Sequence, residues 1–87
     1  MSGDKIEELI QNYLVKKNIY PFSVIYIPSH NLLKMSFYLD SDIEDILTGI
    51  DYEHLCDRTG IVVIKETNTV LFSDIGLNRF IDYVTNN

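Results

Sequence analysis

The residues of this chain that could do chemistry gather in one short stretch, IDYEHLCDRTG, at positions 50–60. It holds the only cysteine, Cys56, with His54 two residues before it and the carboxylates Glu53 and Asp57 close by. A nucleophilic cysteine needs a lowered thiol pKa, which a nearby cation or a helix N-terminus supplies and which flanking carboxylates oppose. A tetrahedral zinc site needs more ligands than the pattern H-x-C provides. The composition of this stretch therefore favours a packing role for the thiol, as a small buried side chain.

A second candidate is DSDIED at positions 40–45, which looks like the start of a calcium-binding loop. An EF-hand loop carries glycine at its sixth position and glutamate at its twelfth. Counted from Asp40, those positions hold Asp45 and Asp51. The chain also contains no phosphate-binding glycine loop and none of the patterns G-x-S-x-G, C-x-x-C or H-E-x-x-H. We therefore expect no catalytic residue, no metal and no cofactor, and we expect that the protein is not an enzyme.

The net charge of −6 is concentrated in one segment, residues 40–57. This segment contains no Lys or Arg, and the remaining 69 residues carry six acids against seven bases. The acids of the segment are Asp40, Asp42, Glu44, Asp45, Asp51, Glu53 and Asp57. Direct binding to nucleic acid is not expected, because phosphate contacts need clustered Lys and Arg. The segment is either a solvated helix face or a surface that docks on a basic partner, and Tyr38 and Tyr52 bracket much of it.

Three amphipathic helices are expected to position these residues. Apolar side chains recur at helical spacing in three places: Ile6, Leu9, Ile10, Tyr13 and Leu14; Ile43, Ile46, Leu47 and Ile50; and Leu77, Phe80, Ile81 and Val84. Ser41 and Glu44 have the spacing of a capping box before the second helix. Asn18 is expected to cap the end of the first helix, before Pro21.

Four strands are expected between the helices, at residues 22–27, 32–39, 61–66 and 69–73. The first and third are apolar on both faces, which favours central positions in a sheet. The second alternates, with Lys34 on its polar face, and is expected at an edge. The fold class is therefore α+β, with the order αββαββα and a four-stranded, mainly antiparallel sheet whose helices pack on one face. The other face would then present either Val24 and its alternates or Ile25 and its alternates. This face is either left exposed, which suggests self-association, or covered by a loop or the last helix.

The length and composition indicate one domain, residues 1–87. The motifs SDI and IDY occur twice, which raises the possibility of a weak ββα repeat, about 20–52 and 60–86. The N-terminus has no basic region followed by an apolar core, and no apolar run is long enough to span a bilayer. A cytoplasmic protein without membrane contact is expected.

Two functions remain open. The first is a small acidic binding protein that engages a basic protein through residues 40–57, for example an inhibitor or immunity-type protein for a nuclease or nucleic-acid-binding machine. The alternative is a homo-oligomeric structural or regulatory subunit, such as a homodimer, that assembles through an exposed sheet face or an edge strand.

Overall fold

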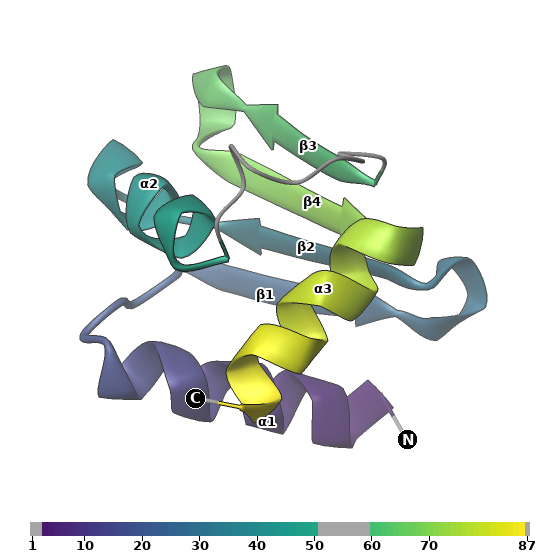
Figure 1. Cartoon of the computed structure of the whole chain (residues 1–87). Helices are drawn as coiled ribbons and strands as arrows, with labels where there is room; N and C mark the ends of the chain where they lie inside the picture. Colours follow the sequence, from purple (N-terminus) through teal and green to yellow (C-terminus); the bar gives the residue numbers. More distant parts are fainter. Residues whose placement is uncertain (1–2, 51–59, 87) are drawn as a thin grey trace.

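Three helices lie on one face of a four-stranded antiparallel sheet (Figure 1). The structure, a computed structural model, describes residues 3–50 and 60–86. In chain order the elements are α1 (Gly3–Lys16), β1 (Ser23–Ile27), the 3-10 turn η1 (Pro28–His30), β2 (Leu32–Ser36), α2 (Asp40–Gly49), β3 (Ile61–Ile64), the 3-10 turn η3 (Lys65–Thr67), β4 (Thr69–Ser73) and α3 (Asp74–Thr85). The predicted α+β class, with its αββαββα order and its helices on one face, is confirmed.

The order of the strands in the sheet is β1-β2-β4-β3, which corrects the expected positions. The strands that are apolar on both faces, β1 and β3, lie at the edges, and β2, which carries Lys34, is central. The expected positions are wrong because a second apolar face on a strand does not require that this face be buried. In the structure that face is uncovered: Ile25 and Val62 are exposed. The expected strand at 32–39 ends at Ser36 instead.

The two hairpins of the sheet have matching geometry. Ile27 and Ile64 precede the 3-10 turns, and Asn31 and Asn68 follow them in the left-handed region, with φ of 47° and 48°. The equivalent positions are 37 residues apart (64 − 27 and 68 − 31). The SDI motifs are 32 apart (73 − 41), so they do not mark equivalent positions.

The same spacing governs how the hairpins meet. Lys34 and Leu71, which are equivalent (71 − 34 = 37), face each other at the centre of the β2–β4 pairing. The β1–β2 register also matches the β3–β4 register, since Ile25 pairs with Lys34 and Val62 pairs with Leu71. The hairpins are therefore related by an approximate two-fold axis that passes through the sheet at Lys34 and Leu71.

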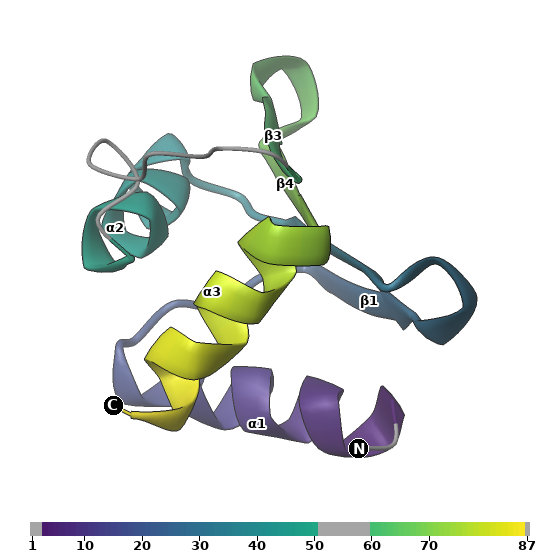
Figure 2. The same cartoon turned by 45° about the vertical axis from the view of Figure 1, so that its right-hand side comes forward.

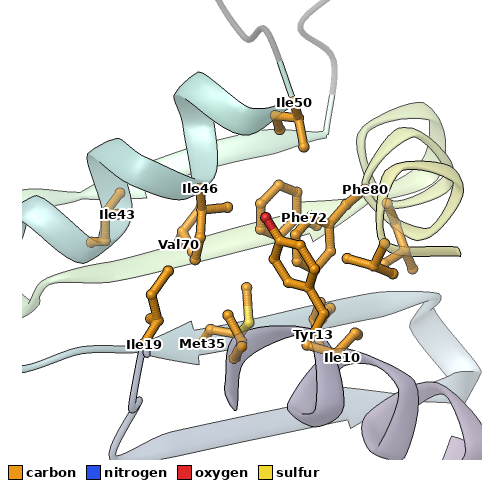
Figure 3. Close-up of a cluster of buried hydrophobic side chains, with 14 of the residues drawn as sticks. Ile10, Tyr13, Ile19, Met35, Ile43, Ile46, Ile50, Val70, Phe72 and Phe80 are labelled. Atoms are coloured by element: carbon orange, nitrogen blue, oxygen red, sulfur yellow. The ribbon is translucent and has the colours of Figure 1, made fainter. Parts of the chain in front are cut away.

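The core lies between the sheet and the helices (Figure 3). From the sheet, Met35, Val70 and Phe72 point into it and have no exposed surface. The Phe72 ring stacks on that of Phe80 in α3, with centroids 4.6 Å apart and an interplanar angle of 10°. Each large apolar side chain buried in this way contributes roughly 1.5–3 kcal/mol to folding. The three predicted apolar stripes supply the helical side of the core: Ile6, Ile10, Tyr13 and Leu14; Ile43, Ile46 and Ile50; and Leu77, Phe80 and Val84.

The helix ends differ in part from the expectation. Asn18 does end α1 in the left-handed conformation, with φ 59°, as predicted. The predicted capping box is absent, because α2 begins at Asp40, one residue before Ser41, and its N-cap Leu39 makes no side-chain cap hydrogen bond. Beside the first strand, Glu7 Oε1 accepts a hydrogen bond from the Tyr26 backbone N–H at 3.2 Å. This bond joins α1 to the edge of β1.

Candidate functional site

An exposed aromatic pair lies at the corner where β2 leads into α2. Tyr38 is 73% exposed and Phe22 is 53% exposed, and their ring centroids are 4.9 Å apart. The backbone N–H of Phe22 donates to the carbonyl of Ser36 at 3.0 Å, which continues the β1–β2 pairing up to this corner. The sheet register brings the two segments together, which explains why the rings meet. Together the rings form an amphipathic surface of the kind found at interface anchors.

A groove adjoins the aromatic pair between the end of α1 and the start of β1. It has a volume of about 340 Å³, and its lining includes Val15, Tyr20, Phe22 and Val24. Val15 and Tyr20 are themselves 58% and 60% exposed. The corner thus offers an apolar depression next to two solvent-facing rings, which suits the side chain of a protein partner.

The acidic residues of α2 begin at Asp40, two residues after Tyr38. The helix turns Ile43, Ile46 and Ile50 into the core, so its opposite face must be polar. Of the acids, Asp40, Glu44 and Asp45 are exposed and Asp42 is partly buried. Asp40 and Asp42 stand in the first turn, where the helix dipole favours negative charge, whereas Glu44 and Asp45 lie beyond it.

Asp45 also borders a second depression, which lies among the three helices. This cleft of about 300 Å³ is lined by Tyr13, Lys17, Ile19, Asp45, Thr48, Gly49 and Tyr83. The rings of Tyr13 and Tyr83 meet edge to face, 5.4 Å apart, and the Lys17 ammonium lies 5.9 Å from the Tyr13 ring centre. A Cβ on Gly49 would come within 2.8 Å of the Tyr83 hydroxyl, so the end of α2 closely approaches α3 here.

The phenol of Tyr13 is held in its neutral form. Burial raises the pKa of Tyr13 well above its usual value, and the hydrogen bond with Tyr83 and the negative charges of Tyr83 and Asp45 raise it further. A phenol with a raised pKa is a poor base and a poor nucleophile at neutral pH. The cleft therefore lies at a packing contact between the helices. Among the described residues that line it, no side chain is activated as a base or a nucleophile.

The structure describes four of the predicted acids and one of the two predicted tyrosines. Tyr38 precedes α2, Asp40, Asp42 and Glu44 belong to its first five residues, and Asp45 borders the cleft. The other predicted partner-binding residues, Asp51, Tyr52, Glu53 and Asp57, lie outside the described residues, as do His54 and Cys56. Sequence reasoning missed the contribution of Phe22, whose signal was an aromatic residue at the start of a strand.

The DSDIED segment forms the start of α2 and is not a loop. Within residues 3–50 and 60–86, no group of three or more His, Cys, Asp or Glu side chains is arranged to hold a metal ion. In the same part of the chain, no helix is both long and apolar enough to cross a membrane. No protein family, no curated protein and no solved structure matches this chain.

Proposed function

We propose that this chain is a small cytosolic binding protein that engages a basic protein through the corner formed by Tyr38, Phe22 and the acidic face of α2. An inhibitor or immunity-type protein for a nuclease, or a blocker of another nucleic-acid-binding machine, is the concrete form of this function. Carboxylates would occupy positions on the partner where phosphates otherwise bind, and no direct contact with nucleic acid is involved.

One observation carries the proposal: two exposed aromatic rings, Phe22 and Tyr38, meet at the corner that leads into α2, and this helix begins with the exposed carboxylates of Asp40 and Glu44. Binding energy at protein interfaces concentrates in a few aromatic or arginine anchors, which a polar rim surrounds. Opposite charge on the rim mainly speeds encounter and selects the partner. Tyr38 and Phe22 would act as the anchor, and Asp40, Asp42 and Glu44 would form the rim.

If the acidic face of α2 served only solubility, a different arrangement would be expected at this corner. It requires carboxylates, but it gives no reason for Tyr38 to be 73% exposed beside a second exposed ring. A Tyr38→Ala variant separates the two readings, because truncating an anchor typically costs a binding interface about 2 kcal/mol or more, roughly 30-fold in affinity. The same change at an exposed side chain leaves folding within about 0.5 kcal/mol.

The experiment is affinity capture from native lysate with the full chain, first at low and then at high salt, followed by identification of the bound proteins. We expect captured proteins with an excess of Lys and Arg, and we expect salt to release them because charge drives the encounter. Tyr38→Ala should lose them at low salt, whereas Ile75→Ala serves as the control, because Ile75 is an exposed apolar side chain of α3 that belongs neither to the aromatic pair nor to the lining of the groove. Equal capture by wild type and Tyr38→Ala would contradict the proposed anchor.

A further inference from the structure

The corner that carries Tyr38 gathers half of the large apolar side chains that are exposed in the described residues, five of ten. Val15, Tyr20 and Phe22 belong to the end of α1 and to its connection with β1, and Tyr38 and Leu39 belong to the connection from β2 to α2. Figure 2 shows the α1–β1 connection and α2 on the same side of the molecule. An apolar patch with a charged helix beside it is typical of a protein-binding site.

Backbone hydrogen bonds fix both walls of the groove in this corner. Asn18, in the left-handed conformation with φ 59°, turns the chain at the end of α1, and the Ile19 N–H donates to the Leu14 carbonyl at 2.9 Å. On the other wall, the Phe22 N–H donates to the Ser36 carbonyl. The groove is therefore formed before a partner arrives, which limits the entropy that binding costs.

The described lining of the groove carries no charge. Gln11 and Ser23 add an amide and a hydroxyl to side chains that are otherwise aliphatic or aromatic. A lysine or arginine side chain placed in the groove would lose water and would meet no carboxylate among these residues, which opposes binding. An apolar side chain gains from the same loss of water. The groove therefore selects an uncharged, apolar side chain.

The rings beside the groove favour an aromatic occupant. Tyr20 and Phe22 line the groove, and the Phe22 ring also contacts that of Tyr38. An aromatic side chain packs against such rings edge to face or offset, and gains more than its buried area alone provides. The groove volume of about 340 Å³ lies at the low end of the range for ligand sites, so it suits a single side chain.

We propose that the partner inserts an uncharged aromatic side chain into this groove while its Lys and Arg residues face the carboxylates of α2. This inference rests on the proposed function, which supplies the basic partner. It adds that the aromatic contact provides most of the affinity, whereas the charges on α2 speed encounter and select the partner. The binding segment of the partner therefore places an aromatic side chain close to basic ones.

The test uses two capped amino acids that differ only in the side chain, N-acetyltryptophanamide and N-acetylargininamide. Each is titrated into the isotope-labelled full chain, and the amide chemical shifts are followed by NMR. A single side chain buries little surface, so dissociation constants on the order of 1–10 mM are expected. The tryptophan compound should shift the amides of Val15, Tyr20, Phe22 and Val24 to saturation, whereas the arginine compound should leave these four unchanged.

A charge placed in the groove distinguishes the two kinds of occupant. Val15 is an exposed residue of α1 that lines the groove, and glutamate is a good helix former, so Val15→Glu should fold normally. This variant should bind the tryptophan compound about tenfold or more weakly, because the new carboxylate must lose water when the ring enters. Ile75→Glu makes a similar change at an exposed position of α3, outside the groove, and should bind like wild type.

Two results would overturn the inference. One is the absence of saturable shifts at the groove with the tryptophan compound, or equal binding by wild type and Val15→Glu. The other is saturation of the groove by the arginine compound, with tighter binding to Val15→Glu, which would assign the groove to a cation. Capture of a basic partner that depends on α2, without binding of the tryptophan compound, would refute this inference and leave the proposed function standing. Binding of the compound without a basic partner would do the reverse.

Discussion

Replacing Glu44 by glutamine should stabilise the fold, although the change removes a charge from the proposed binding surface. Glu44 is exposed, lies four residues after Asp40 and adjoins Asp45. Within residues 3–50 and 60–86 it forms no ion pair with a basic side chain. Its charge therefore meets repulsion from the carboxylates of Asp40 and Asp45, with no ion pair among the described residues to offset it.

The expected magnitude follows from the geometry of the helix. Like charges at positions i and i+4 destabilise a helix by about 0.2–0.5 kcal/mol. The helix dipole offsets this cost for acids in the first turn, but Glu44 lies beyond that turn. For a domain of this size, about 4–8 °C of melting temperature corresponds to 1 kcal/mol, so Glu44→Gln should raise the melting temperature by about 1–4 °C.

Differential scanning calorimetry at about 20 mM and about 0.5 M salt provides the assay, because salt screens repulsion between exposed charges. The gain should be present at low salt and should largely disappear at high salt. Asp40→Asn is the control: it removes the same repulsion but also a favourable charge at the helix N-terminus, so it should give no gain. A lower melting temperature for Glu44→Gln at low salt, or a gain that persists in high salt, would refute the reasoning.

Two further predictions concern stability. Asn68 holds a left-handed conformation with φ 48°. Asn68→Val should therefore lower the free energy of unfolding, measured by urea titration, by at least about 1–2 kcal/mol, whereas Asn68→Gly should be tolerated. Equal effects of the two changes would argue against this turn geometry. Because burial raises the pKa of Tyr13 above the value of 10.0 expected when unfolded, the stability that its neutral phenol provides is complete below pH 10 and is lost as the pH rises above it. Tyr13→Phe should therefore reduce the loss of stability above pH 10, by at most about 1.4 kcal/mol per pH unit. The measurement is the urea midpoint of wild type and variant at increasing pH. If the two proteins lose stability equally as the pH rises, Tyr13 is not the group responsible.

The helices and the fold class follow from local patterns in the sequence. The stripe Ile43, Ile46 and Ile50 repeats at helical spacing whatever the rest of the chain does, and all three side chains are buried. The order of the strands is not a local property. Ile25 and Val62 give β1 and β3 two apolar faces, and the sequence alone does not show whether the second face is covered by protein or left open.

The candidate site could be predicted only in part for the same reason. The acids of α2 follow from the stripe on its opposite face, and Tyr38 follows from its position just before them. The approach of Phe22 to Tyr38 depends on the register that pairs Ser23 with Ser36, a contact between distant parts of the chain. The start of α2 at Asp40, ahead of the expected cap at Ser41, also reflects tertiary context: the Phe37 N–H donates to the Asn68 carbonyl, which anchors the preceding residues to the second hairpin.

The central claim, that the acidic face of α2 binds a basic partner, is tested most directly by one comparison of dissociation constants. The captured partner is titrated by calorimetry at low salt against wild type and against two variants that each lose four charges. The first variant changes Asp40, Asp42, Glu44 and Asp45 to their amides. The matched control changes Glu8, Glu66, Asp74 and Asp82, which are exposed acids outside α2.

At about 0.3–1 kcal/mol for each exposed ion pair, the α2 variant should bind about tenfold or more weakly. The control should stay within about threefold of wild type, since its charges act only from a distance through salt solution. Equal weakening by both variants would show that net charge, and not this surface, attracts the partner. Unchanged binding by the α2 variant would contradict the proposed function.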